Sequence, residues 1–357
     1  MPGLPCGGAE RFVVDLANEL SKYNDVYILT FRDGKDADFY RPQISERVHQ
    51  IIYRGNYSFF SKLWQFIVVA RLIVKIRPEI VHTHLIAIPY AIIPSLLMSN
   101  LKVLYTIHSL ASKDTKAKIP AKMRKLLLKK WFRGITISQQ CEKSFKEFYG
   151  YGSYGLIENG CRELMLSNQI DSVKKEIRNL CPSDKSIVYI CVARIMREKN
   201  HLMLIQAFNY LINRGEDVVL LMIGSYDDRS VLKQSLDQVI CDTNRIHFLG
   251  TRTNIPDYLA CSDYFCLTSI WEGLPISLIE AGMMGCYPVC TPAGGIVDVV
   301  RDDRWGVLSK DFSKDSYVEA IDLAKKKKVN KQELIDLYKS EYSIANCAKK
   351  YMEVYNE

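Results

Sequence analysis

Two glutamates, Glu272 and Glu280, lie on either side of a predicted helix start in the segment TSIWEGLPISLIEAG. A strand of buried type ends just before it, and open α/β sheets bind ligands where such strands end. Pro275 suits the first helical position, and the N–H groups that follow would favour an anion such as a pyrophosphate. Carboxylates accept hydrogen bonds from hydroxyls on both sides of a phosphate. The segment therefore predicts a site for a sugar, a phosphate and a ribose, although a surface helix with two solvated glutamates would give the same spacing.

Two cations follow an earlier predicted strand in the segment VARIMREKN. The strand ends at Ala193, and Arg194 and Lys199 flank the entry to the next helix. Positive side chains at the carboxyl end of a strand can neutralise a leaving diphosphate and replace a metal ion. Ordinary surface cations would look the same, so the pair gains meaning only beside the two glutamates.

Histidines mark two predicted strands of the first half. His108 closes the strand Val103–His108, where it would face a ligand or serve as a structural histidine. His82 and His84 alternate along one strand face, but two histidines without a third ligand are a weak zinc pattern. A D-x-D at 36–38, which some metal-dependent transferases use, stands in a polar stretch that favours a turn. We therefore predict no metal site.

Short β-branched runs alternate with helical patterns along the chain, which is typical of parallel sheets with crossover helices. The expected strands are 25–31, 80–84, 103–108, 134–137, 187–193, 218–223, 245–248, 264–268 and 287–290. The expected helices are 12–20, one from about 61 that stops near Pro78, 201–214, 230–239, 275–284, 316–325 and 343–355. The fold class is therefore α/β.

The domain boundary is expected just after the turn dipeptide Asn159-Gly160. The predicted domains are residues 1–165 and 166–340, and residues 341–357 would form a helix that packs back on the first domain. Near the start, a Gly-rich turn opens a helix, and such a turn normally follows a strand. Barely any residue precedes it, so we expect the first strand of the N-terminal sheet to be missing.

Composition narrows the class of protein without selecting a ligand. The 357 residues, 48% hydrophobic and 25% charged, suit two globular domains, and a net charge of +8 fits anionic partners. The 11 cysteines show no C-x-x-C spacing, and neither a signal peptide nor a membrane-spanning stretch is visible. A cytoplasmic protein is expected. Nucleic-acid binding would rest on charge alone and is not expected.

Taken in order, these pieces resemble the retaining glycosyltransferases of family four, group 1, which have the GT-B fold. The matching pieces are GGAER at 7–11, TIH at 106–108, Ser138, ENG at 158–160, Arg194 with Lys199, Gly224, Gly250 ahead of NIPDY at 254–258, the E-x7-E pair and Gly294-Gly295. The resemblance covers nearly the whole chain and implies two Rossmann-like domains facing across a cleft. Apart from the missing strand, the sequence departs from the family at Cys161-Arg162, where a small apolar residue and Asp are usual.

The resemblance implies an enzyme that uses a UDP- or GDP-sugar without a metal or cofactor and retains the anomeric configuration. Domain 1–165 would bind the acceptor and domain 166–340 the donor. The residues expected to act in catalysis are Glu272, His108, Arg194 and Lys199. Those expected to bind the donor are Gly7, Gly8, Gly250, Thr251, Gly273, Leu274, Pro275, Ile276, Ser277 and Glu280.

In this assignment the two cations bind the diphosphate and His108 contacts the transferred sugar. Glu272 binds the sugar hydroxyls, Glu280 binds the ribose, and the loop after Gly250 lies against the base. Gly7 and Gly8 let the backbone approach the ligand. Transition-state stabilisation would be largely electrostatic.

The segment 113–133 is basic and amphipathic, with nine lysines and arginines against one acid. Such a helix suits an anionic membrane surface, although a solvated cationic helix packed on the sheet would show the same sequence pattern. Many acceptors in the family are lipid-linked saccharides, so we expect a saccharide or lipid-linked acceptor, a role in cell-surface polysaccharide synthesis, and peripheral contact with the inner face of the membrane. Two alternatives remain, a GT-B-fold sugar-nucleotide epimerase and a non-catalytic nucleotide-sugar-binding protein.

Overall fold

The chain divides into two units. The computed structural model describes residues 1, 3–31, 38–53, 59–113, 120–225 and 231–357. Unit 1 comprises Met1–Arg162 and Ile344–Glu357, and unit 2 comprises Glu163–Ser343. The first segment of unit 1 ends at Arg162, three residues before the expected boundary at residue 165. The last helix of the chain belongs to unit 1.

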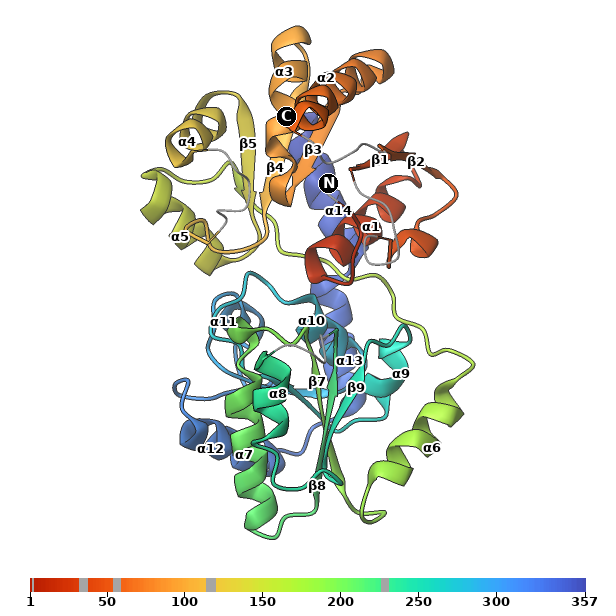
Figure 1. Ribbon diagram of the computed structural model, residues 1–357, viewed down its shortest axis with the longest axis vertical. Coiled ribbons are helices and arrows are strands. Elements are labelled where there is room, and N and C mark those ends of the chain that lie inside the picture. Colours follow the sequence, from red (N-terminus) through yellow and green to blue (C-terminus); the bar gives the residue numbers. More distant parts are fainter. Residues whose placement is uncertain (2, 32–37, 54–58, 114–119, 226–230) are drawn as a thin grey trace. The chain divides into compact units, whose positions relative to one another are not determined.

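Unit 2 is built on a six-stranded parallel sheet in the order β12-β11-β10-β7-β8-β9 (Figure 1). The strands are β7 (Ile187–Val192), β8 (Val218–Ile223), β9 (Ile246–Gly250), β10 (Tyr264–Leu267), β11 (Tyr287–Cys290) and β12 (Val307–Leu308). All five strands expected in this half are present. The sixth strand, β12, was not expected, because a strand of two residues is too short to show a periodic pattern.

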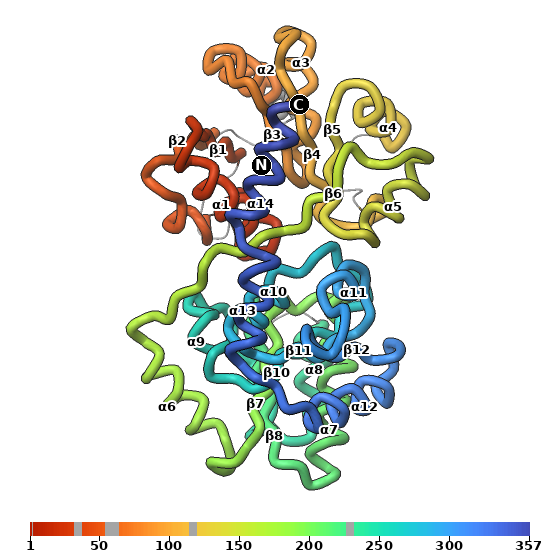
Figure 2. The backbone as a smooth tube through the Cα atoms, turned by 180° about the vertical axis from the view of Figure 1, so that it is seen from behind, coloured from red at the N-terminus to blue at the C-terminus, as the bar shows by residue number. Residues whose placement is uncertain are grey.

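Helices cover both faces of this sheet, with α7 and α8 on one face and α13 on the other (Figures 1 and 2). The helices are α6 (Ile170–Leu180), η4 (Arg197–Lys199), α7 (His201–Asn213), α8 (Val231–Asp237), α9 (Ile255–Ala260), α10 (Ile276–Met283), α11 (Ile296–Val299), α12 (Lys314–Lys325) and α13 (Lys331–Tyr342). Helix α13 was not expected, since lysines precede it. Leu334, Tyr338 and Tyr342 recur at helical spacing and are buried, and a Cβ on Gly282 of α10 would meet the Tyr338 ring at 2.3 Å.

Unit 1 contains two parallel sheets, β1-β2 and β3-β4-β5-β6. The strands are β1 (Val26–Thr30), β2 (Val48–Ile52), β3 (Ile80–His84), β4 (Lys102–Ile107), β5 (Phe132–Thr136) and β6 (Gly155–Leu156). Among the described residues, no strand precedes α1. Instead the Met1 amine donates to the Leu29 carbonyl at 2.8 Å, and Leu4 is fully buried against α1 and β1.

The helices of unit 1 lie on both faces of its four-stranded sheet. They are α1 (Gly8–Leu20), η1 (Arg41–Gln43), α2 (Phe59–Ile76), η2 (Leu85–Ala91), α3 (Ile92–Leu97), α4 (Ala121–Lys130), α5 (Gln139–Tyr149) and α14 (Ile344–Asn356). Alternate residues of β4 point to opposite faces. Tyr105 packs in the core with residues of η2, α4 and α5, whereas Thr106 contacts Tyr351 of α14 at 3.0 Å. Figure 2 shows α14 in front of the sheet.

Helix α14 is tied to the strands that it crosses. The Val354 carbonyl accepts a bond from Arg133 at 2.6 Å, and the Tyr355 carbonyl accepts one from Lys102 at 2.8 Å. The departure from the family at Arg162 also has a local partner, because its Nε lies 3.8 Å from the Asp15 carboxylate of α1. The bonds from Arg133 and Lys102 make the C-terminal helix an integral part of unit 1.

Two expectations about the basic segment are wrong in detail. The helix spans only Ala121–Lys130, and Arg133 lies in strand β5. Arg124 does not belong to a solvated cationic face, since it is 2% exposed and lies over the rings of Phe148 and Tyr149. Residues 114–119 and most of the D-x-D at 36–38 lie outside the described residues.

Candidate functional site

The candidate site of unit 2 lies where β7, β10 and β11 end and α10 begins. Pro275 is the N-cap of α10 rather than its first helical residue, which corrects the predicted start by one position. Ile276, Ser277 and Leu278 then form the first turn, whose N–H groups have no acceptor within the helix. These groups carry the positive end of the helix dipole, so this edge of the sheet favours an anion.

Glu272 is held in front of this helix by two side chains. Lys199 Nζ forms a salt bridge with Glu272 Oε1, and Ser269 Oγ donates to the same oxygen at 2.6 Å. Glu272 is only 8% exposed, so both bonds act in a partly desolvated setting that strengthens them. Within the described part of the chain, Oε2 accepts no hydrogen bond. The geometry thus orients the carboxylate through one of its two oxygens.

Backbone contacts fix the two loops that supply this pair. Thr268 Oγ1 donates to the Lys199 carbonyl at 3.1 Å, and the Ile270 N–H donates to the Glu198 carbonyl at 2.8 Å. Gly294, at a φ of +54°, approaches so closely that a Cβ would lie 2.0 Å from the Glu272 carbonyl oxygen. Only glycine suits that position, and the close approach holds the Glu272 loop in place.

The other expected residues of unit 2 lie around the same sheet edge. Arg194 is exposed and stands two residues after the end of β7, and Glu280 lies one turn into α10, partly buried. Gly250 ends β9 at a φ of +69°, its carbonyl accepts a bond from Gly224 at 3.0 Å, and Thr251 is exposed. Gly273 and Leu274 are buried in the loop before Pro275. The structure joins Lys199 directly to Glu272 and records no contact between Arg194 and that pair.

Three of the expected residues belong to unit 1. Gly7 caps α1 in an extended conformation, and its carbonyl accepts a bond from Arg11 at 3.0 Å. Gly8 is the exposed first residue of that helix. A Cβ on Gly7 would lie 2.4 Å from the Glu10 carboxylate, which would have to move aside.

His108 belongs to a cluster of three histidines at the end of β3 and β4, of which His84 is buried and the other two are half-buried. Its Nε2 lies 2.9 Å from Nδ1 of His84, so one ring donates and the other accepts. The ring of His84 contacts that of His82 with centroids 4.1 Å apart. His82 binds Tyr355 through Nδ1 and Thr106 through Nε2, both at 2.7 Å. The cluster links His108 to α14.

Burial keeps all three rings neutral at neutral pH. It lowers the pKa of His108 to about 4 and that of His82 to about 3, and it lowers the pKa of His84 well below its ordinary value. His108 therefore acts as a neutral hydrogen-bonding group, not as a cation.

We expect the histidine cluster to make unit 1 less stable as the pH falls. Unfolded histidines bind protons below a pKa of about 6.5, whereas the folded rings stay neutral down to about pH 4, so the unfolded state binds more protons in between. Each ring then removes up to about 1.4 kcal/mol of unfolding free energy per pH unit across that window. Urea titrations between those pH values measure the slope.

The variant His84→Gln should flatten this slope, and the exposed His49→Gln should leave it unchanged. His49 is a suitable control because its side chain is 57% exposed beside Asp25. An unaltered slope in the His84 variant would contradict the assignment.

Sequence reasoning missed Ser269, Gly294 and His84 as parts of the site. Ser269 stands three residues before Glu272, a spacing at which a loop can turn a hydroxyl onto a carboxylate. His84 ends β3 and pairs with Thr106 of β4, so His108, two residues after Thr106, follows on the same side of the sheet. The spacing of Ser269 and the strand end at His84 could both have been recognised in the sequence. The role of Gly294 could not, since it depends on an approach between loops.

Family models match both halves of the chain. Residues 172–340 match the glycosyl transferases group 1, and residues 6–161 match glycosyltransferase family 4. The chain belongs to the family 4, group 1 glycosyltransferases. The expectation of a glycosyltransferase is therefore confirmed.

Curated relatives of this glycosyltransferase include proteins named for lipid-linked acceptors. It is 27% identical over 282 residues to the Escherichia coli UDP-Gal:alpha-D-GlcNAc-diphosphoundecaprenol alpha-1,3-galactosyltransferase, covering 74% of this chain and 71% of the relative. It is 26% identical over 174 residues to a Campylobacter jejuni N-acetylgalactosamine-N,N'-diacetylbacillosaminyl-diphospho-undecaprenol 4-alpha-N-acetylgalactosaminyltransferase, covering 47% and 45%.

Solved structures show that this glycosyltransferase has the GT-B fold with two Rossmann-like domains. The Anabaena protein HepE in complex with UDP and glucose has a TM-score of 0.80 at 18% identity, covering 100% of this chain and 98% of that one. A glycosyltransferase from Rickettsia africae has a TM-score of 0.82 at 20% identity, covering 99% and 96%. At these identities the likeness concerns the fold, and the fold class expected from the sequence is confirmed.

Proposed function

We propose that this glycosyltransferase moves a sugar from a nucleotide-diphosphate sugar to a saccharide or lipid-linked saccharide acceptor, with retention and without a metal ion, in cell-surface polysaccharide synthesis. One observation carries the proposal. A largely buried carboxylate, Glu272, is oriented by Lys199 and Ser269 in the loop that leads into the first turn of α10. This arrangement offers a hydroxyl acceptor beside an anion site, which is what a sugar diphosphate requires.

In this proposal Arg194 and Lys199 neutralise the diphosphate together with the first turn of α10. Glu272 accepts hydrogen bonds from the donor sugar and Glu280 from the ribose. The backbone around Gly273–Ser277 lines the phosphates, and Gly250 with Thr251 lies against the base. Residues Gly7, Gly8 and His108 serve the same reaction from unit 1, where His108 would contact the transferred sugar as a neutral ring.

The chemistry that follows is a front-face substitution. The bond between the anomeric carbon and the diphosphate oxygen breaks, and the acceptor oxygen bonds to that carbon from the same face. The acceptor proton passes to the leaving phosphate oxygen, so no protein base is required. The negative charge that develops on the diphosphate is stabilised by the two cations and the helix N–H groups, which are fixed before the reaction.

A donor screen tests this proposal. UDP, GDP and their sugars would be titrated by calorimetry, with and without a chelator, and transfer products would be analysed by NMR for anomeric configuration. We expect one nucleotide series to bind, and the ligands of similar proteins favour UDP. Its affinity should be the same with and without the chelator, and the product should retain the anomeric configuration of the donor sugar. Binding that requires a divalent cation, or an inverted product, would overturn it.

The same assay separates the two alternatives. An epimerase would interconvert free nucleotide sugars in the absence of acceptor, and a non-catalytic binding protein would bind the donor without hydrolysis or transfer.

We also propose that the exposed face of α4 contacts an anionic membrane surface. Lys122, Lys125, Lys129 and Lys130 are exposed there, and Met123, Leu126 and Trp131 stand among them at 50%, 45% and 58% exposure. Cations interleaved with apolar side chains are typical of helices that lie on such a surface. Among the described helices none is long and apolar enough to cross a membrane.

Sedimentation with vesicles containing phosphatidylglycerol tests this contact. Replacing the four lysines by glutamine should weaken binding by about a hundredfold or more, since each basic residue near the surface contributes about 1 kcal/mol. Equal binding by the substituted protein would remove the proposal for α4.

A further inference from the structure

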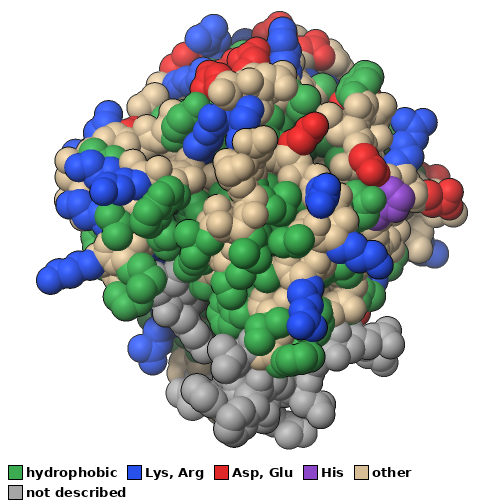
Figure 3. Space-filling view, turned by 90° about the horizontal axis from the view of Figure 1, so that it is seen from above, with side chains coloured by type: hydrophobic (Ala, Val, Ile, Leu, Met, Phe, Trp, Pro, Cys, Tyr) green, Lys and Arg blue, Asp and Glu red, His purple; other side chains and the backbone are tan. Residues whose placement is uncertain are grey.

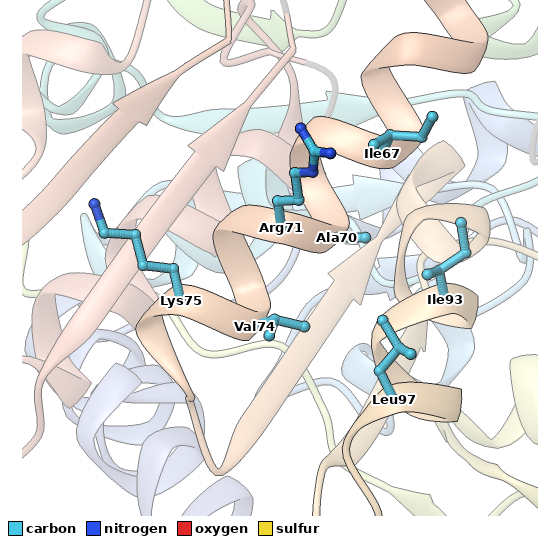
Figure 4. Close-up of a pocket in the computed structure, with 7 residues that line it drawn as sticks. All are labelled: Ile67, Ala70, Arg71, Val74, Lys75, Ile93 and Leu97. Atoms are coloured by element: carbon cyan, nitrogen blue, oxygen red, sulfur yellow. The ribbon is translucent and has the colours of Figure 1, made fainter.

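Helices α2 and α3 leave an apolar groove on the surface of unit 1. The groove has a volume of about 410 Å³ and is lined by Ile67, Ala70, Arg71, Val74, Lys75, Ile93 and Leu97. Figure 4 shows Ala70 and Val74 of α2 pointing toward the α3 side chains, while Arg71 and Lys75 extend from the other side of α2. Apolar side chains therefore face one another between the two helices, and the cations lie on the α2 side of the groove.

Helices α2 and α3 expose several large apolar side chains. Leu96 and Leu97 are 74% and 66% exposed, Ile93 is 38% exposed, and Trp64 on α2 is 53% exposed. Figure 3 shows hydrophobic side chains gathered in the middle of this face, with lysines and arginines among them. Contiguous exposed apolar patches of this kind mark contact surfaces.

The charge on these two helices has one sign. Neither α2 nor α3 contains an acidic residue, and the nearest acid along the chain, Glu79, stands beyond the end of α2. Arg71 lies over the Trp64 ring at 5.9 Å, which places a guanidinium beside an indole. A surface of exposed leucines, an interfacial indole and unopposed cations is complementary to anionic headgroups above hydrocarbon.

We infer that the α2–α3 groove docks unit 1 on an anionic phospholipid bilayer, with Leu96, Leu97 and Trp64 entering the interface and Arg71 and Lys75 contacting the headgroups. The inference rests on the proposed lipid-linked acceptor, whose hydrocarbon must remain in a bilayer while its saccharide is extended. The α4 face lies on the same side of the four-stranded sheet as α3, because successive right-handed crossovers β3-β4-β5 place both helices there. The groove adds the apolar part of a contact to which α4 contributes charge.

Vesicles of phosphatidylethanolamine and phosphatidylglycerol test the groove. We expect the double variant Leu96→Asp with Leu97→Asp to reduce vesicle partitioning by about tenfold or more, because two leucine side chains lose their burial and two charges are added. The change Leu323→Asp on α12 is the matched control, since that leucine is 47% exposed in unit 2, and it should partition like wild type. Arg71→Gln with Lys75→Gln should lower the preference for phosphatidylglycerol and leave a salt-resistant fraction.

Tryptophan fluorescence locates the contact. In a Trp131→Phe background, brominated lipids should quench Trp64, and the paired leucine change should abolish that quenching. No quenching, with partitioning unaltered in the leucine variant, would overturn the inference. The groove would instead be a contact between copies of the chain if three results coincide. The wild type would be a dimer in solution and would not bind vesicles, and the leucine variant would be a monomer.

The test is independent of the proposed reaction. Calorimetric binding of UDP should be equal in wild type and the leucine variant, because the groove lies in unit 1 and the candidate donor site in unit 2. If wild type fails to bind any nucleotide, the proposed function falls, while vesicle partitioning still decides the groove.

Discussion

Replacing Glu272 by alanine should lower kcat/KM for sugar transfer by about a hundredfold or more, because the transition state loses charge-assisted bonds and a partly buried lysine loses its partner. The carboxylate is 8% exposed and accepts bonds from Lys199 and Ser269 on one oxygen. Its free oxygen is the group that we assign to the donor sugar. Steady-state kinetics with the donor identified by the screen would measure the loss.

The fold should survive this change. Lys199 keeps 20% of its side-chain exposure, so solvent reduces the cost of leaving it unpaired to about 1–3 kcal/mol of unfolding free energy. The variant Ser269→Ala retains the carboxylate and should lose less activity. The exposed Glu319→Ala is the matched control and should turn over normally. Wild-type turnover by the Glu272 variant would remove the basis for the assigned site.

Replacing Lys199 by alanine should lower kcat by about 10²–10³-fold, the range found when one preorganised electrostatic group is removed from an active site. The loss should appear mainly in kcat, because the charge on the diphosphate grows as the glycosidic bond breaks. Lys199→Arg keeps the charge and should recover part of the rate, although a guanidinium cannot reproduce the compact ammonium contact with Glu272.

A matched cation two residues away serves as the control. Arg197 lies on the same η4 turn and is exposed, so Arg197→Ala should behave like wild type. The double variant lacking both Lys199 and Glu272 should lose much less than the product of the single losses, because the two side chains act as one contact. Strictly additive losses would show that the two groups act separately and would contradict the joint site.

Local patterns in the sequence were enough to predict most elements of unit 2. Strands such as Val218–Ile223 are continuous apolar runs, which is what a parallel sheet covered on both faces requires. The same logic placed Arg194 and Lys199 after one strand and Glu272 after another. Because parallel strands end at one edge, their convergence could be expected before any coordinates were known.

Elements with weak or split patterns could not be predicted. Helix α13 follows a run of lysines, and its apolar side chains become meaningful only where Tyr338 packs against Gly282 of α10. Arg124 was counted among the nine basic residues of the segment 113–133, yet it is buried over two aromatic rings from α5. Charge in a sequence does not tell which way a helix is turned, because neighbouring elements select the buried stripe.

The sequence by itself determined the fold class, the family and the residue types at the candidate site, because these depend on periodicity and on motif order along the chain. The tertiary structure alone decided which of those residues touch. It paired Lys199 with Glu272, added Ser269 and Gly294, and joined His108 through His84 and His82 to a helix more than 240 residues later in the chain. Such contacts join segments far apart in the chain, so their geometry is set by packing and not by any local pattern.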